Sequence, residues 1–244
     1  MFDRYKAFRF REGELQPVSY PHVPDFNSLL HIDYQKEVLY RNTLQLLHGL
    51  PANDALLWGE RGTGKSSLVK SLLGLFAPMG LKLVQVYKMD IMQLSDLYGV
   101  LRDRPEKFIL FFDDLSFDPS EDSLHALKSV MEGDVEERPS NVVVYATSNR
   151  RYLMPQREEE EKFPEESYSE RASLVERFGI RLAFLAFGKE QYLSIVKHLA
   201  RGVELEEERL EALALEWALQ RGFSGRSASQ FVKHLQGMKA LGLL

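Results

Sequence analysis

The octapeptide at residues 59–66, Gly-Glu-Arg-Gly-Thr-Gly-Lys-Ser, constrains the fold more than any other part of the chain. Its spacing is that of a phosphate-binding loop, in which a glycine, four further residues and a second glycine precede Lys and then Ser or Thr. Glycines let backbone N–H groups wrap around a phosphate because no Cβ stands in the way. Lys65 would bring a positive charge to the β- and γ-phosphates of a nucleotide, and the Ser66 hydroxyl would be a ligand for Mg²⁺.

The segments on either side of the loop support this interpretation. Ala55–Trp58 is a short apolar run typical of a buried strand, and Ser66–Phe76 has apolar residues at helical spacing. A strand, a glycine loop and a helix N-terminus together aim unpaired N–H groups at an anion. The alternative, a glycine-rich turn that happens to contain a lysine, does not require these neighbours. The predicted cofactor-binding residues of the loop are Gly59, Glu60, Arg61, Gly62, Thr63, Gly64, Lys65, Ser66 and Ser67.

Composition limits the class of protein. The chain has 244 residues, a formal net charge of −5 and no cysteine. Disulfides and thiolate metal sites are therefore excluded, and a dedicated non-specific DNA-binding protein is disfavoured. The charged N-terminus does not resemble a signal peptide, and no apolar run reaches the length of a membrane span. We expect a soluble, cytoplasmic protein without a membrane partner.

Strands and helices are expected to alternate from residue 55 onward, and only helices are expected after Gly188. The strand candidates are almost continuously apolar, which favours a parallel sheet with helices on both faces, the α/β class. The predicted strands are 55–58, 81–87, 108–112, 142–146 and 180–187; the predicted helices are 31–50, 66–76, 95–102 (with Ser95 as N-cap), 120–131, 189–200, 205–221 and 227–241.

These expectations divide the chain into three parts. Residues 1–54 would form an N-terminal segment that packs on the nucleotide site, residues 55–188 a P-loop α/β domain, and residues 189–244 a helical lid. Residues 156–170 are rich in glutamate, which is typical of a solvated loop. The alternative is a surface that docks a basic partner.

Two acidic residues, Asp113 and Asp114, follow the apolar run Phe108–Phe112. A carboxylate at the carboxyl end of a buried strand beside a phosphate loop holds Mg²⁺, which is the Walker B role. We assign this role to Asp113 and expect Asp114 to stand where a catalytic base for water belongs; the alternative is an exposed acidic pair. Asn149, after the next strand candidate, would orient the attacking water, but an Asn there is commonly a turn residue.

Four segments together resemble one family. They are LLWGERGTGKSSLVKSLL at Leu56–Leu73, FFDDLSF at Phe111–Phe117, YATSNRR at Tyr145–Arg151 and SGRSASQFV at Ser224–Val232. The order of these motifs looks like an AAA+ P-loop ATPase with a helical lid. The strings resemble a family of stand-alone bacterial AAA+ proteins of unknown function, and the similarity runs through nearly the whole chain.

The resemblance implies roles for individual residues around Mg²⁺-ATP. One departure concerns the Walker B motif, because most AAA+ ATPases have Asp-Glu where this chain has Asp113-Asp114. The shorter side chain of Asp114 reaches less far toward water, which puts the rate of hydrolysis in question but not the binding of ATP. The resemblance implies that Lys65, Ser66 and Asp113 bind Mg²⁺-ATP, that Asn149 is sensor 1, and that Ile32 and Leu29 line the adenine.

Two arginines gain roles only through the resemblance, because each taken alone is an ordinary surface residue. Arg177, in Glu-Arg-Phe-Gly before the strand candidate 180–187, would be the arginine finger that reaches the ATP of a neighbouring subunit in a homo-oligomer. Arg171 is the competing candidate for the finger. Arg226, beside a Ser227 helix cap, would be sensor 2 and contact the γ-phosphate from the lid.

Three functions remain open on the sequence. The first is an Mg²⁺-dependent ATPase whose turnover remodels or assembles an unidentified protein or nucleic-acid client. The second is an ATP-gated switch or scaffold with little hydrolysis, which stays open because Asp114 replaces the usual Glu. The third is a small-molecule kinase, which the separate C-terminal lid disfavours because P-loop kinases usually insert their lid within the α/β core. A steady-state ATPase assay distinguishes the first two.

Overall fold

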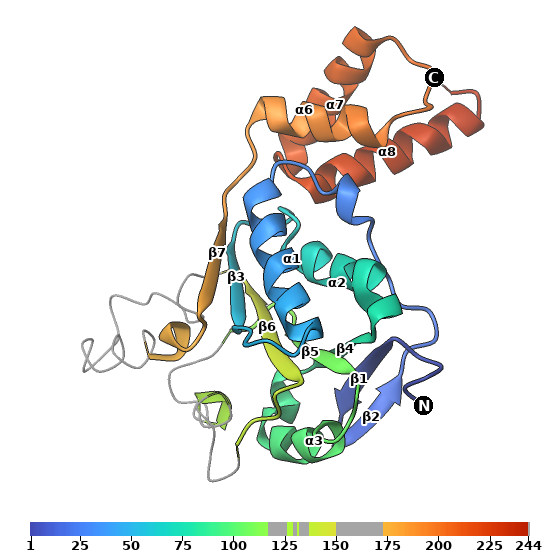
Figure 1. Cartoon of the computed structure of the whole chain (residues 1–244). Helices are drawn as coiled ribbons and strands as arrows, with labels where there is room; N and C mark the ends of the chain where they lie inside the picture. The colour runs from blue at the N-terminus through green and yellow to red at the C-terminus, as the bar shows by residue number, and fades with distance from the viewer. Residues whose placement is uncertain (117–125, 129–130, 132–136, 150–172, 244) are drawn as a thin grey trace.

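The computed structural model of the chain describes residues 1–116, 126–128, 131, 137–149 and 173–243. Figure 1 shows an α/β body with the sheet at its centre and a layer of helices at one end, formed by α6 (Lys189–Leu199), α7 (Glu207–Arg221) and α8 (Gly225–Ala240). The predicted helix 120–131 falls largely outside the described residues, and the glutamate-rich stretch 156–170 falls entirely outside them.

The described residues form a sheet of seven strands in the order β2-β1-β4-β5-β6-β3-β7. Every neighbouring pair is parallel except β1 with β2. The predicted α/β class with a parallel sheet is therefore confirmed. The strands are β1 (Ala7–Arg11), β2 (Glu14–Pro17), β3 (Ala55–Gly59), β4 (Leu81–Val86), β5 (Lys107–Phe112), β6 (Val142–Ser148) and β7 (Ile180–Phe184).

Helices cover both faces of this sheet, which explains the continuous apolar runs in the sequence. Successive residues of a strand point to opposite faces. Leu57 of β3 accordingly joins the apolar cluster formed with α1 and α2, whereas Leu56 joins the cluster formed with α3. The described helices of the body include α1 (Asp33–Leu47), α2 (Lys65–Phe76) and α3 (Leu94–Leu101), with short 3₁₀ helices η1 (Phe26–Ser28), η2 (Ala77–Met79) and η3 (Lys88–Gln93).

The sheet takes two further strands, β1 and β2, from the N-terminal segment, where no strand is predicted from the sequence. β1 pairs in parallel with β4. β2 follows β1 after a tight turn, in which Glu12 and Gly13 both have positive φ, and pairs antiparallel with β1. Along β1, Phe8 and Phe10 are buried while Arg9 is exposed. This alternation is typical of a strand with one face on the core.

Two predicted helix caps are wrong. η3 leads directly into α3, whose N-cap is Gln93, so Ser95 lies inside the first turn of the helix. The N-cap of α8 is Ser224, whose hydroxyl oxygen accepts a hydrogen bond from the backbone N of Ser227 at 3.0 Å. Ser227 is itself buried inside the first turn. In both cases the helix begins before the serine that was predicted to cap it.

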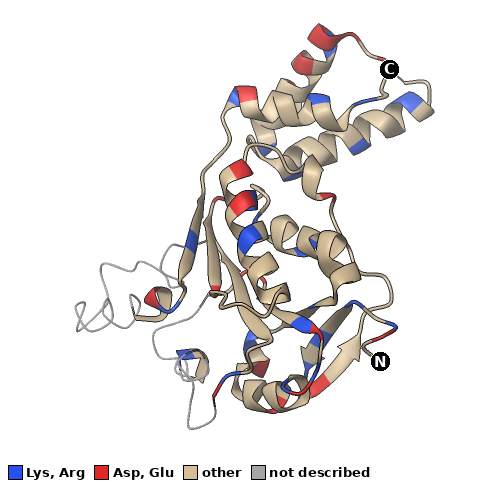
Figure 2. Cartoon of the chain, in the orientation of Figure 1, with Lys and Arg blue, Asp and Glu red and all other residues tan. Residues whose placement is uncertain are grey.

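The helices α6, α7 and α8, called the lid below, pack on one another and belong to the same apolar cluster as α1 and α2. Tyr192 of α6 is fully buried and donates a hydrogen bond from its hydroxyl to the carbonyl oxygen of Ala214 in α7 at 3.1 Å. Figure 2 shows acidic and basic residues interspersed over the body and the lid. Within the described part of the chain, no helix has the length and apolar character needed to cross a membrane.

Candidate nucleotide site

A cavity of about 840 Å³ lies where the phosphate loop, the carboxyl ends of β5 and β6, the N-terminal segment and the lid meet. Parallel strands place their carboxyl ends along one edge, where ligands of open α/β sheets bind. Because β6 separates β3 from β5, residues after β5 and β6 stand beside the loop that follows β3. The loop residues 61–67, Asp113, Asp114, Asn149 and Arg226 all line this one cavity.

The phosphate loop requires glycine at two positions for reasons of space. Gly59 has φ +127°, and a Cβ there would lie 2.1 Å from the carbonyl oxygen of Phe184 in β7. Gly62 has φ +74°, and a Cβ there would lie 2.9 Å from the Ser224 side chain. The loop is therefore packed tightly against β7 on one side and against the start of α8 on the other.

Lys65 begins α2 and turns back over the loop. Its ammonium donates hydrogen bonds to the carbonyl oxygens of Gly59 at 2.7 Å and Glu60 at 2.6 Å, and to Asn149 Oδ1 at 3.2 Å. Burial lowers the pKa of the Lys65 ammonium, and the nearby carboxylate of Asp114 opposes that shift. Lys65 is thus a largely buried cation at a helix N-terminus, where anions bind.

Asp113 accepts hydrogen bonds from two hydroxyl groups, one in the phosphate loop and one on β6. Its Oδ1 accepts hydrogen bonds from Ser66 Oγ at 2.5 Å and from Thr147 Oγ1 at 2.9 Å. Hydroxyl and carboxylate oxygens are the hard ligands that Mg²⁺ prefers, and Mg²⁺ is typically held by one or two protein groups together with phosphates and water. Among the described residues, no cluster of three or more His, Cys, Asp or Glu forms a metal cage. Ser66 and Asp113 supply oxygen donors of the kind that holds Mg²⁺ together with phosphates.

Asp114 stands next to Asn149 at the carboxyl ends of β5 and β6. The Asp114 backbone has φ +58°, in the left-handed region that non-glycine residues seldom occupy. Its Oδ1 accepts a hydrogen bond from Asn149 Nδ2 at 2.5 Å, and its backbone N donates to Thr147 Oγ1 at 2.9 Å. Strained conformations of this kind cluster at functional sites. A continuous chain of contacts thus runs from Lys65 through Asn149 to Asp114.

The lid reaches the cavity through the first turn of α8. The backbone N of Gly225 donates a hydrogen bond to the Gly62 carbonyl oxygen at 2.9 Å, which joins the lid directly to the phosphate loop. Arg226, the next residue, lines the cavity. A cation at a helix N-terminus is unfavourable for the helix dipole. A bound anion would offset that cost.

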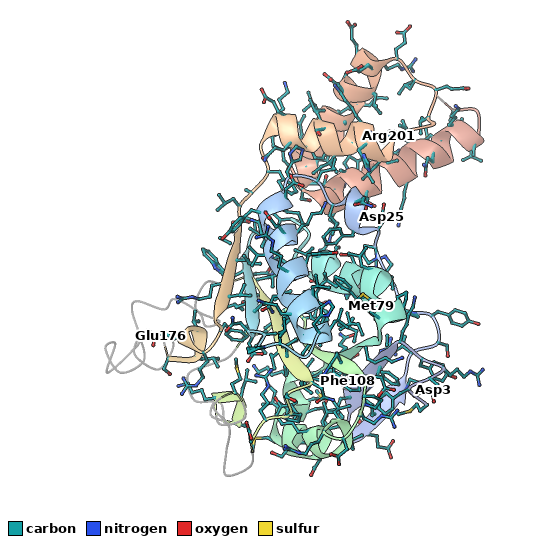
Figure 3. All side chains as sticks on the ribbon, viewed as in Figure 1. Asp3, Asp25, Met79, Phe108, Glu176 and Arg201 are labelled. Atoms are coloured by element: carbon teal, nitrogen blue, oxygen red, sulfur yellow. The ribbon has the colours of Figure 1, made fainter. Side chains whose placement is uncertain are left out.

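The segment before α1 also lines the cavity and contributes apolar residues to it. Leu29 and Ile32 both line it, as the adenine assignment requires. Ile32 is buried, and its Cδ1 would lie 3.5 Å from a Cβ on Gly64. In Figure 3 Asp25, from the same N-terminal segment, lies beneath the lid helices.

Arg177 lies away from this cavity. It stands three residues before β7, and the pairs Ala55–Ile180 and Gly59–Phe184 show that β7 begins at the end of the sheet opposite to the loop. The Arg177 guanidinium donates a hydrogen bond to the Ser173 carbonyl oxygen. In Figure 3 the neighbouring Glu176 lies far from Arg201 of the lid. The competing finger candidate, Arg171, lies outside the described residues.

Two residues of the site were not anticipated from the sequence. Thr147 bonds both Asp113 and Asp114, and Lys70 places its ammonium 3.2 Å from Asp113 Oδ2. The sequence spacing could have indicated both Lys70 and Thr147. Lys70 follows Ser66 by one helical turn, and Thr147 precedes Asn149 by two residues at the carboxyl end of β6.

The sequence model of one family, described as "Protein of unknown function (DUF815)", matches residues 3–239. The chain belongs to this family. No curated protein is detectably similar to this member of DUF815.

Several solved structures share the fold of this DUF815 chain. A point variant of Thermotoga maritima RuvB has a TM-score of 0.61 and 17% identity over 88% of this chain and 64% of that chain; another RuvB structure is described as a Holliday junction branch migration motor. Aeropyrum pernix Orc1 in complex with DNA has a TM-score of 0.62 and 15% identity over 92% of this chain and 66% of that chain. Cdc6p from Pyrobaculum aerophilum has the same TM-score and identity over 92% of this chain and 65% of that chain.

These similarities show that the chain shares its fold with RuvB, Orc1 and Cdc6p, which are AAA+ P-loop ATPases. The chain spans about 64–66% of the length of the three solved chains. The activities and partners of those longer proteins therefore bear on this chain only as proposals.

Proposed function

We propose that this chain is an Mg²⁺-dependent ATPase that acts as an oligomer to remodel or assemble a protein or nucleic-acid client. One observation carries the proposal: a single cavity brings together the phosphate loop, a carboxylate bonded to the loop serine, and a second carboxylate paired with an amide. Phosphoryl transfer to water depends on positioning and on neutralising the charge of the γ-phosphate oxygens. These groups serve both needs.

Each residue has a defined task in this proposal. Lys65 exchanges its carbonyl partners for the β- and γ-phosphate oxygens. Ser66 and Asp113 would hold Mg²⁺, which would supply positive charge at the phosphates. Asn149 orients a water molecule, and Asp114 takes its proton as the oxygen attacks the γ-phosphorus and the bond to the β-phosphate oxygen breaks, giving ADP and phosphate.

The proposal includes a second subunit, because Arg177 is remote from its own phosphate loop. A neighbouring copy of the chain would bring this arginine to the γ-phosphate of the first. The client is proposed only by class: RuvB is a branch migration motor and Orc1 was crystallised with DNA, which makes nucleic acid one class to test beside protein.

A specific observation also favours the ATP-gated switch as a second candidate. Asp114 is shorter than the glutamate usual at this position and is already bonded to Asn149 at 2.5 Å. A carboxylate held by this hydrogen bond would take a proton from water less readily than a free one. ATP would then stay bound for longer before it is hydrolysed. Steady-state turnover distinguishes the two functions, since a switch binds ATP tightly and hydrolyses it slowly.

Replacing Lys65 with alanine is expected to weaken ATP binding by about 10- to 100-fold, because a buried charge-assisted contact worth about 1.5–3 kcal/mol is lost. Isothermal titration calorimetry with Mg²⁺-ATP measures the change. Lys239→Ala is the matched control, since Lys239 lies at the far end of α8 and pairs with the exposed Glu204. Equal ATP affinity for the Lys65→Ala variant and the parent would overturn the assignment of the nucleotide site.

Replacing Arg226 with alanine is expected to narrow the difference between the affinities for ATP and ADP. The reason is that Arg226 is assigned to the γ-phosphate, which only ATP carries. Competition binding with both nucleotides gives the ratio of the two dissociation constants. Arg209→Ala, at an exposed position of α7, should leave the ratio at the parent value. An unchanged ratio in Arg226→Ala would return Arg226 to an ordinary surface role.

A further inference from the structure

Lys70 makes a contact that no part of the proposed reaction uses. It lies four residues after Ser66 on α2, and residues at this spacing occupy the same face of a helix. Ser66 Oγ and Lys70 Nζ therefore both reach Asp113, at 2.5 Å from Oδ1 and 3.2 Å from Oδ2 respectively. With Thr147 Oγ1 also on Oδ1, both oxygens of Asp113 are occupied by donors.

The ammonium of Lys70 is held in this place by its surroundings. It lies 5.5 Å from the centre of the Phe111 ring, on β5, the strand that ends just before Asp113. The side chains of Lys70 and Asp113 are only 27% and 28% exposed, so solvent screens their attraction only in part. The ammonium of Lys70 therefore lies at the same carboxylate, Asp113, that is assigned to bind Mg²⁺.

We propose that Lys70 is the counter-ion of Asp113 whenever the divalent cation is absent, and that Lys70 and the metal exclude one another there. The inference rests on the proposed function, because it takes Asp113 as the metal ligand. An unpaired Asp113 carboxylate beside the phosphate loop would repel the triphosphate of a nucleotide. Lys70 removes that repulsion before Mg²⁺ arrives, and Mg²⁺ removes it afterwards.

The proposal makes the effect of Lys70 depend on the metal. Replacing Lys70 with methionine, which keeps an unbranched stem without the charge, should weaken ATP binding about 10-fold in EDTA, because one partly screened charge contact is lost. With saturating Mg²⁺ the same variant should bind ATP within about 2-fold of the parent, since the metal then neutralises Asp113. Calorimetric titrations with ATP in EDTA and in Mg²⁺ give the ratio of the dissociation constants of the variant and the parent under each condition.

Three further variants make this test specific. Lys70→Arg should behave like the parent in EDTA because the charge is retained. Asp113→Asn combined with Lys70→Met should bind ATP in EDTA better than Lys70→Met alone, because the repelling charge is gone. Lys239→Met, a lysine change at the far end of α8, should alter neither ratio.

Metal binding without nucleotide tests whether Lys70 and the metal compete for Asp113. Mn²⁺ serves as the probe, and its binding to the nucleotide-free protein is followed by electron paramagnetic resonance. Lys70→Met should bind Mn²⁺ several-fold more tightly than the parent, because no ammonium competes for Asp113 Oδ2. A structural role for Lys70 would instead weaken Mn²⁺ binding or leave it unchanged.

The outcomes separate this inference from the proposed function. If the parent protein binds no ATP with Mg²⁺, the proposed function itself fails. If the parent binds ATP but Lys70→Met loses the same factor with and without Mg²⁺, Lys70 is only structural and the inference is overturned. If Lys70→Met matches the parent in EDTA and in Mn²⁺ affinity, the contact has no electrostatic role and the inference is likewise overturned.

Discussion

Arg177→Ala is expected to bind ATP with the affinity of the parent and to hydrolyse it about 10³–10⁵-fold more slowly, the range that an arginine finger contributes in related chemistry. The expectation follows from the position of Arg177 before β7, at the end of the sheet opposite to its own phosphate loop. An arginine there can neutralise charge only at the site of another subunit. Calorimetry and a steady-state ATPase assay measure the two quantities. Arg181→Ala, an exposed arginine on β7 itself, is the matched control.

Mixing two inactive variants tests the trans arrangement directly. Lys65→Ala lacks its phosphate contact but keeps the finger, and Arg177→Ala lacks the finger but keeps the loop. A mixed oligomer therefore contains some sites with both groups, and activity should return above that of either variant alone. Size-exclusion chromatography of differently tagged chains shows whether they co-assemble. Co-assembly without any recovered activity would mean that Arg177 does not act across the interface.

Asp114→Asn is expected to reduce turnover by on the order of 10²-fold or more while ATP binding remains, because a general base is lost and the amide keeps the shape of the side chain. Asp114→Glu should retain turnover because it retains a carboxylate. Single-turnover hydrolysis of radiolabelled ATP measures both variants without interference from product release. If Asp114→Asn turns over at the parent rate, the base is another group. Glu60, and Glu121 outside the described residues, are then the next candidates.

The sequence predicted the part of the site that is built from local signals. The phosphate loop, β3 before it and α2 after it follow from glycine spacing and from apolar periodicity within one short stretch. Asp113 and Asp114 followed from their place after an apolar run. The strand order puts β6 between β3 and β5 and so brings Asn149 beside Lys65, and the two residues share a hydrogen bond at 3.2 Å.

What the sequence did not predict depends on contacts between distant segments. The pairing of β1 with β4 joins residues far apart in the chain, and its alternating pattern is short. Thr147 and Lys70 gain their roles only when β5, β6 and α2 are brought together around Asp113. The cap at Ser95 was wrong because a 3₁₀ helix starts the same helical segment earlier, which a single serine cannot reveal.

The attachment of β7 has a consequence for how neighbouring subunits would communicate. All five residues of β7 pair with β3, and the backbone N of Glu60 donates a hydrogen bond to the Phe184 carbonyl oxygen at 2.9 Å. Arg177 lies three residues before β7, so a short segment joins it to the strand that pairs with β3 and contacts the phosphate loop of its own subunit. An arginine attached in this way would be expected to move with the sheet of its own subunit. Its distance from a neighbour's ATP would change only when one whole body rotates against the next, so each hydrolysis event would reset the geometry of the two interfaces that a subunit shares.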